Sequence, residues 1–146
     1  MKTRHRAREL VLQSLYEMDI RNNLSLDNIE NDYFPCLTQA EIDDLEEEVK
    51  IYASFLLRGT LSEIEEIDKS ISEFSFNRPL SKIDIVDRNI LRLSIFSLLQ
   101  NEVHPHIIID EAVKLSKDFS SEVNYKFING ILDAFQKKYK LEAKFN

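Results

Sequence analysis

The chain has 146 residues, of which 43% are hydrophobic, and this length suits one compact domain with a buried core. Two glycines and three prolines are too few for the turns of a β-sandwich or barrel, and the single cysteine, Cys36, excludes an internal disulfide. The formal net charge is −7, and because the sequence has neither a signal peptide nor a long apolar run, we expect a soluble, cytoplasmic protein that does not contact a membrane.

The first predicted helix covers residues 4–20, where small and apolar side chains recur on one face at helical spacing. This stripe consists of Ala7, Val11, Ser14, Leu15 and Met18. A polar break follows, and then a short helix is expected over residues 25–35, ending near Pro35.

A stronger pattern predicts one helix over residues 38–59. Thr38 and Glu41 have the spacing of a capping box at its start, and Gly59 is a typical stop signal. Residues 61–74 continue with a regular stripe of leucine, isoleucine and phenylalanine, which predicts another amphipathic helix.

The second half of the sequence begins with a break at Pro79. Ser81 and Asp84 form a second capping-box pattern, which predicts a helix over residues 82–100. Apolar residues cover much of the circumference of this helix, so we expect it to be the buried centre of the fold. Two further helices are predicted, one over residues 107–119 and one that starts within residues 120–124, and the fold class is therefore all-α.

Patterns of an active site are weak throughout the sequence. His104 and His106 flank a proline in a predicted turn, and two histidines alone do not make a metal site. The two glycines lie too far apart for a phosphate-binding loop. The acidic residues between 41 and 48 fall on the solvent face of an amphipathic helix. We therefore predict that the protein is not an enzyme and needs no cofactor or metal.

The first eight residues are basic although the whole chain is acidic. They contain Lys2, Arg4, Arg6 and Arg8 and no acidic residue. Because the Debye length is about 8 Å at physiological salt, acidic residues elsewhere would not cancel an anion-binding surface at this end. Terminal basic clusters that serve only solubility are the alternative.

One exposed stripe of the first helix has side chains suited to single-stranded nucleic acid. At 100° per residue the stripe contains Lys2, Arg6, Glu9, Gln13 and Tyr16. Basic side chains pair with phosphates, an amide reads base edges and an aromatic ring stacks on bases. A chance arrangement of polar residues on a solvated helix is the alternative for this stripe. Arg4 and Arg8 lie on another side near Leu15, and a structural role for Arg8, with its stem packed on the core, is the alternative there.

Two long motifs resemble the NusB family of bacterial transcription antitermination factors. The first is RHRARELVLQSLYEMD, and the second is NRPLSKIDIVDRNILRLSIFSLL followed by VHPHIIIDEAVKLSKDFSSEVNYKFINGILD. The resemblance covers about residues 4–20 and 74–135, whereas residues 21–73 match in helical character only. It implies a NusB-like fold, in which N-terminal and C-terminal helical bundles pack into one compact unit of about seven helices. We accordingly expect one domain over 1–146, with halves at 1–76 and 77–146.

The resemblance also implies a function and partners. Proteins of this family bind boxA, a single-stranded element in nascent ribosomal RNA leaders, together with a small-subunit ribosomal protein called NusE. The pair belongs to the RNA polymerase antitermination complex and promotes transcription of ribosomal RNA genes. Some members form homodimers, so a homodimer is also among the implied partners.

Residue roles carry over by position in the motifs. The implied RNA-binding residues are Lys2, Arg4, Arg6, Arg8, Gln13, Tyr16 and Phe127. The implied contacts to the ribosomal protein are Asp84, Asp87 and Arg88. Core packing is the alternative for Phe127, and an N-cap with an i,i+4 pair is the alternative for Asp84 and Arg88. Gly130 costs about 1 kcal/mol relative to alanine inside a helix, and close backbone approach is the expected reason.

The chain departs from the family before the last helix, where Val123 replaces a family acid. Two rival functions also remain. One is a helical protein-interaction module without RNA contact, which would bind through the acidic face at 41–48. The other is an RNA methyltransferase, because some of these enzymes carry a NusB-like domain. That rival would need a catalytic portion and a glycine-rich cofactor loop beyond the patterns seen in this sequence.

Overall fold

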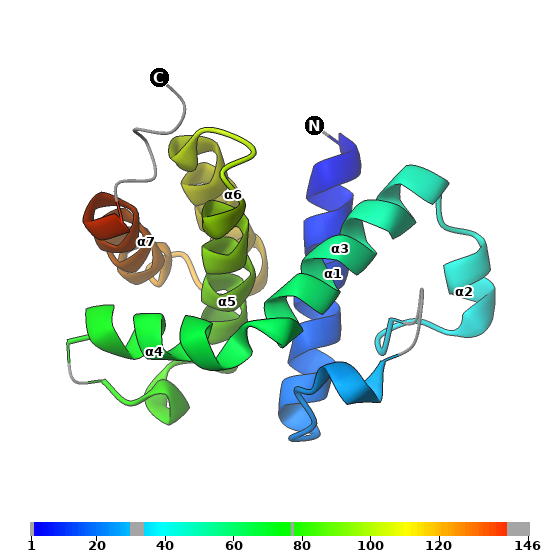
Figure 1. The fold of residues 1–146 in the computed structure, drawn as a ribbon, viewed down its shortest axis with the longest axis horizontal. Coiled ribbons are helices and arrows are strands. Elements are labelled where there is room, and N and C mark those ends of the chain that lie inside the picture. Colours follow the sequence, from blue (N-terminus) through cyan, green and yellow to red (C-terminus); the bar gives the residue numbers. More distant parts are fainter. Residues whose placement is uncertain (1, 30–33, 77, 140–146) are drawn as a thin grey trace. The chain divides into compact units, whose positions relative to one another are not determined.

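The computed structural model describes residues 2–29, 34–76 and 78–139 (Figure 1). Within these ranges the chain forms seven α-helices and two short 3₁₀ helices, and no strand occurs there. The all-α prediction is thus confirmed. The chain divides into two compact units, Met1–Ser62 and Glu63–Asn146.

The first unit is built on two long helices, α1 (Lys2–Ile20) and α3 (Glu47–Ser62), which pack against each other (Figure 1). The 3₁₀ helix η1 (Leu26–Asn28) and the short helix α2 (Gln39–Asp43) precede α3. The predicted α1 stripe is buried in full, and on α3 the buried residues include Val49, Ala53, Leu56 and Leu57. The periodicity of α1 therefore identified its packed face correctly.

The helix predicted over residues 38–59 is wrong in extent, because the structure has two helices there. The Thr38–Glu41 capping box is confirmed, since both of its hydrogen bonds are formed. However, α2 ends at Asp43, and α3 begins at Glu47 and continues through Gly59 to Ser62. Like charges repel along one continuous helix, whereas Glu47 and its neighbour in the first turn of α3 favour a new helix N-terminus.

The short helix expected over residues 25–35 is replaced by the three-residue η1 in the described part of this segment. Ser25 caps η1 by accepting a hydrogen bond from the N–H of Asp27. Residues 30–33 lie outside the described ranges. Cys36 is half-buried, as predicted for a small apolar residue, and its Sγ lies 3.3 Å from Ser14 Oγ. Burial raises the pKa of this thiol.

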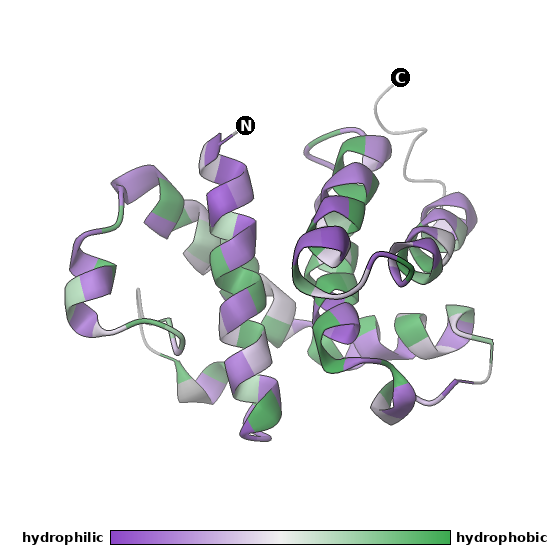
Figure 2. Cartoon of the chain, turned by 180° about the vertical axis from the view of Figure 1, so that it is seen from behind, coloured by the Kyte–Doolittle hydropathy of each residue, from purple (hydrophilic) through white to green (hydrophobic). Residues whose placement is uncertain are grey.

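The second unit surrounds the helix α5 (Ile85–Gln100), in which every residue from Asn89 to Leu98 is buried. Figure 2, coloured by hydropathy, shows how hydrophobic residues are spread over the helices. The helices α4 (Ile64–Phe74), α6 (Pro105–Phe119) and α7 (Tyr125–Tyr139) pack against it, and the 3₁₀ helix η2 (Leu80–Lys82) precedes it. The prediction that this helix is a buried centre is confirmed for its own unit.

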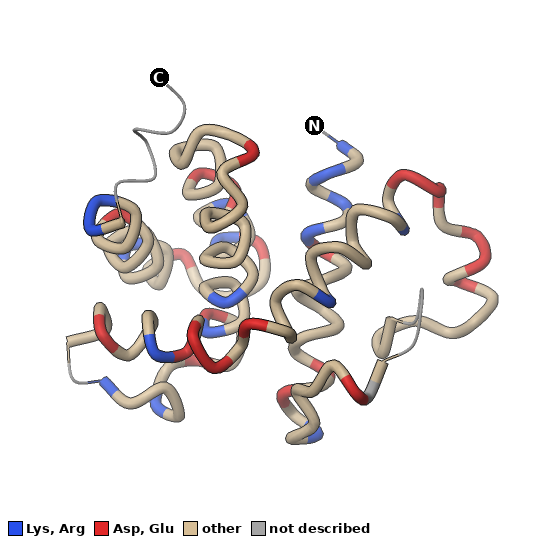
Figure 3. The backbone as a smooth tube through the Cα atoms, in the orientation of Figure 1, with Lys and Arg blue, Asp and Glu red and all other residues tan. Residues whose placement is uncertain are grey.

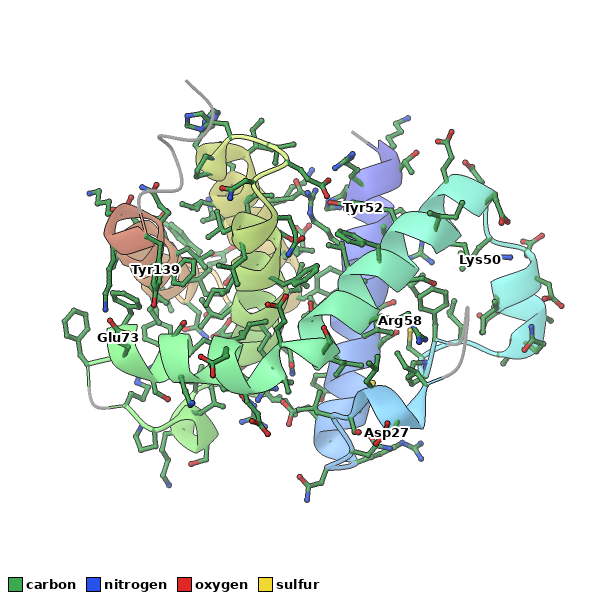
Figure 4. The ribbon with its side chains drawn as sticks, viewed as in Figure 1. Asp27, Lys50, Tyr52, Arg58, Glu73 and Tyr139 are labelled. Atoms are coloured by element: carbon green, nitrogen blue, oxygen red, sulfur yellow. The ribbon has the colours of Figure 1, made fainter. Side chains whose placement is uncertain are left out.

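The helix α4 packs into the second unit through its buried Ile67 and Ile71, and polar contacts to α5 and α7 add to this packing. Asp68 accepts hydrogen bonds from Nε and Nη2 of the buried Arg92 at 2.9 and 3.1 Å. Glu73 pairs with Lys138 near the end of α7 (Figure 4). Along the chain, the boundary between the two units lies between Ser62 and Glu63, whereas the predicted boundary lay between residues 76 and 77. The expectation of a single domain over 1–146 stays a prediction.

Helix α5 begins later than predicted, because its N-cap is Asp84 and not Ser81. Ser81 lies in η2, and Asp84 is the N-cap, accepting hydrogen bonds from the N–H groups of Val86 and Asp87 at 2.9 and 3.3 Å. Helix α7 begins after a turn in which Ser121 Oγ accepts from the N–H of Asn124 at 3.1 Å. In the described part of the chain no helix has the length and hydropathy needed to cross a membrane.

Candidate nucleic-acid interface

The predicted stripe on α1 is open to solvent at most of its positions. Lys2, Arg6 and Gln13 are exposed, and Tyr16 is half-buried. The Arg6 side chain is 45% exposed, and its Nη1 lies 4.0 Å from a carboxylate oxygen of Glu9, one turn away. A surface pair of this kind is worth little, so the arginine is available to a phosphate. Figure 3 shows this concentration of basic residues at the start of α1.

The other two arginines of the motif turn toward Tyr52 on α3. Figure 4 labels this tyrosine. The guanidinium carbon of Arg4 lies 4.5 Å from the centre of the Tyr52 ring. The guanidinium carbon of Arg8 lies 5.9 Å from it, and Arg8 Nη2 donates a long hydrogen bond of 3.5 Å to the Tyr52 hydroxyl. Arg8 is only 5% exposed, which favours its structural alternative, whereas Arg4 is half-buried.

Basic and acidic side chains gather on different segments of the first unit. The first turn of α1 contains no acidic residue. The acidic side chains at 41–48 are exposed, as predicted, around α2 and the start of α3 (Figure 3). Glu47 pairs with Lys50 at 3.6 Å, and the pKa of the Glu41 carboxyl is lowered by its hydrogen bonds in the capping box. This acidic surface suits a cationic partner better than a phosphate backbone.

In the second unit, Phe127 lies in the first turn of α7 and is half-buried. The guanidinium carbon of Arg78, from the loop before η2, lies 4.6 Å from the centre of its ring. The ring therefore combines packing with a partly accessible surface, and neither of its two predicted roles excludes the other.

The three residues expected to contact the ribosomal protein differ in exposure. Asp84 is exposed, and Arg88 is half-buried and donates a 3.4 Å hydrogen bond to the backbone oxygen of Ile83. Asp87 is only 2% exposed, and its Oδ2 accepts a 2.8 Å hydrogen bond from the side chain of Asn124. Burial raises the pKa of the Asp87 carboxyl. Asp87 thus joins α5 to the start of α7, whereas Asp84 offers a surface.

The explanation offered for Gly130 is wrong within this chain. A Cβ atom built on Gly130 meets no described atom within 4 Å, and the residue is exposed. Close approach of another part of the described chain is therefore not the reason for glycine here. The residue stands on the outer side of α7, one turn after Phe127.

The histidines do not build a metal site in the described residues. His104 Nδ1 caps α6 by accepting from the N–H of His106 at 3.2 Å, and the two rings lie 4.5 Å apart. No group of three or more histidine, cysteine or acidic side chains in the described ranges could hold a metal ion.

Two residues next to the candidate interface were missed from the sequence. Tyr52 and Arg78 were given no role in the interface, because periodicity does not report contacts between distant segments. Their cation–π contacts with Arg4 and Phe127 appear only once the helices are packed. Val123, the departure from the family pattern, is 70% exposed in the turn before α7.

Comparisons with known proteins agree with this arrangement of helices. The family model described as the NusB family matches residues 5–137. The transcription antitermination protein NusB of Leptospira biflexa is 39% identical over 139 residues, which cover 94% of each chain. Among solved structures, NusB of T. maritima has a TM-score of 0.77 at 29% identity and covers 92% of this chain and 90% of its own. A structure of NusB and NusE in complex with dsRNA has a TM-score of 0.75 at 26% identity and covers 95% and 99%.

Proposed function

The chain belongs to the NusB family, and from this premise we propose that it acts as an RNA-binding transcription antitermination factor. Its RNA ligand is boxA in nascent ribosomal RNA leaders, bound together with the ribosomal protein NusE. The relatives are named as transcription antitermination proteins, which agrees with the prediction that the chain is not an enzyme. A solved relative in complex with NusE and dsRNA supports NusE and an RNA ligand as partners.

The observation that carries the proposal is the exposed basic face at the start of α1. Lys2 and Arg6 are exposed there, and Arg4 is half-buried, so about three basic groups can approach phosphates. The amide of Gln13 is exposed farther along the helix and can read the edge of a base. Tyr16 adds aromatic surface for unstacked bases on this unit, and Phe127 offers a separate aromatic surface on the second unit.

Arg8 supports this face without touching RNA. Its buried guanidinium stands against Tyr52, which fixes α1 on α3 and keeps the register of the exposed stripe. Within one motif, some arginines therefore bind phosphates, whereas Arg8 packs α1 against α3.

NusE binding is assigned to the start of α5. Asp84 and Arg88 supply side chains that reach the surface there, and Asp87 holds the adjoining corner through Asn124. The wider assignments follow from the family: the protein acts in the cytoplasm within the RNA polymerase antitermination complex, and a homodimer is a further state.

The test measures binding of fluorescein-labelled single-stranded boxA RNA with and without NusE. If about three phosphates are neutralised, affinity should fall roughly 20-fold between 50 and 200 mM salt. Arg6→Glu should weaken binding strongly without a change in thermal stability. Lys69→Glu is the matched control, because Lys69 is also exposed and also pairs with a glutamate one turn away, at 3.3 Å.

A flat salt response, or equal effects of the two variants, would overturn the RNA-binding proposal. Binding to NusE that persists without any RNA affinity would instead favour the protein-interaction module and its acidic face at 41–48. Replacing the acidic residues at 41–48 by neutral ones separates the two functions, because RNA binding should not depend on these residues.

A further inference from the structure

The loop between α4 and η2 presents two unusual side chains. Phe76 is 91% exposed and its φ is 51°, in the left-handed region that a bulky residue adopts at an energetic cost. Arg78, two residues later, is also exposed. A strained backbone that places an aromatic ring in water gains nothing from packing, so it points toward a ligand.

Hydrogen bonds to Ser75 hold the backbone of Arg78 in place. The N–H of Arg78 donates to the backbone oxygen of Ser75 at 3.1 Å, and the hydroxyl of the buried Ser75 donates to the backbone oxygen of Arg78 at 2.9 Å. Pro79 follows and restricts the backbone of Arg78 to extended conformations. Arg78 is therefore positioned before any ligand arrives.

The ring that faces Arg78 is positioned as well. Asn124 accepts backbone hydrogen bonds from the N–H groups of Phe127 and Ile128 at 3.1 and 3.3 Å. Its side chain donates to Asp87 at 2.8 Å, which fixes the first turn of α7 against α5. The guanidinium carbon of Arg78 lies 4.6 Å from the Phe127 ring centre, and the backbone of each residue is held by hydrogen bonds.

We infer that Arg78 and Phe127 together form a stacking site for an unpaired RNA base, with Phe76 as a second aromatic contact on the same loop. The inference rests on the proposed function and adds Arg78 and Phe76 to its RNA-binding residues. The guanidinium lies over the phenyl ring, and its exposed side can stack on a base while its N–H groups donate to a phosphate or a base edge. The open surface at Gly130, one turn after Phe127, leaves room for the sugar–phosphate chain.

The alternative, in which Arg78 only packs on the Phe127 ring, requires a different kind of side chain at position 78. A side chain that only covers Phe127 needs hydrophobic area, and lysine or leucine would supply it. A stacking site needs the planar guanidinium itself, because an ammonium group cannot stack. The substitution Arg78→Lys therefore separates the two roles while it keeps the charge.

The experiment measures the affinity of single-stranded boxA RNA for the full chain in the presence of NusE. Arg78→Ala should weaken binding about 5- to 150-fold, the range expected for loss of one stacked base. Arg78→Lys should remain close to Arg78→Ala. Lys114→Ala is the matched control, because it removes an exposed basic residue from α6 and should leave affinity unchanged. Phe76→Ala should weaken RNA binding without lowering the melting temperature.

A series of RNAs with single abasic positions identifies the stacked base. At that position the abasic substitution and Arg78→Ala should not be additive, whereas at other positions they should be. This cycle also carries the test if Arg78→Ala lowers the melting temperature, since it compares RNAs on the same protein.

Three outcomes would overturn the inference. Wild-type affinity of Arg78→Ala, beside a strong loss in Arg6→Glu, removes the stacking site and leaves the proposed function standing. Full rescue by Arg78→Lys reduces the role of Arg78 to charge. Loss of NusE affinity with unchanged RNA affinity makes the loop a protein contact. If neither Arg6→Glu nor Arg78→Ala changes RNA binding, the proposed function itself fails.

Discussion

Arginines two residues apart on α1 should respond to truncation in opposite ways. Arg8→Ala removes two methylene groups from a side chain that is 5% exposed, which costs about 1.6 kcal/mol at roughly 0.8 kcal/mol for each buried methylene. Loss of the cation–π contact with Tyr52 adds about 0.5–1 kcal/mol. The hydrogen bond of 3.5 Å to the Tyr52 hydroxyl is long and adds little. The total loss is about 2–3 kcal/mol.

Arg6→Ala removes much less stability. Its side chain is 45% exposed, and its ion pair with Glu9 at 4.0 Å is worth about 0.2–0.5 kcal/mol. In a domain of this size 1 kcal/mol shifts the melting temperature by about 2–4 °C. We therefore expect a fall of about 5–10 °C for Arg8→Ala and less than about 2 °C for Arg6→Ala.

The binding assay should give the reverse order. Arg6→Ala should reduce the salt slope of single-stranded RNA binding by about 0.7, the contribution of one phosphate. Arg8→Ala, measured well below its melting temperature, should keep the wild-type slope. Calorimetry and fluorescence anisotropy on the same preparations give both quantities. Unchanged thermal stability in Arg8→Ala, with a slope reduced as much as in Arg6→Ala, would refute the structural role of Arg8.

Three further substitutions test the second unit. Asp68→Asn should cost about 3 kcal/mol in urea unfolding, because the buried Arg92 loses its anionic partner; no change would mean that the pair does not anchor α4. Asp87→Asn tests how protonation of Asp87 affects stability. Because the pKa of Asp87 is raised in the folded protein, the folded state favours the protonated carboxyl, and this stabilisation is lost as pH rises above about 4. The wild type should therefore lose stability relative to the variant between about pH 4 and 7. Gly130→Ala should gain about 0.5–1 kcal/mol, and destabilisation would show that this site is crowded.

Most of the helices could be predicted from the sequence, because their signals are local. The α1 stripe follows from the 3.6-residue period, and the capping box at Thr38 needs only two side chains at the right spacing. The correction at the end of α3 also has a physical reason. The stop expected at Gly59 fails because α3 keeps burying Thr60 and Leu61, and this packing outweighs the low helix propensity of one glycine.

The candidate interface was predicted only in part, because its remaining features depend on tertiary contacts. A helical wheel separates Lys2 and Arg6 from Arg8 but cannot report that Tyr52, 44 residues after Arg8, stands against it. Equally, Phe127 can be placed on an apolar stripe, but the stacking of Arg78 on its ring depends on how a loop packs on α7. Residue types indicated the chemistry, and the packing determined which residues can perform it.

The placement of the basic residues on α1 also explains how an acidic protein binds RNA locally. Lys2, Arg4 and Arg6 stand at the positive end of the helix dipole, where cations are unfavourable by a few tenths of a kcal/mol each, and no acidic residue in the first turn offsets them. A bound phosphate is attracted both by these cations and by the helix N-terminus, so it relieves the local repulsion. This gain is independent of sequence. Discrimination among RNAs must therefore come from Gln13 and the aromatic side chains, and variants at those positions should change sequence preference more than the salt slope.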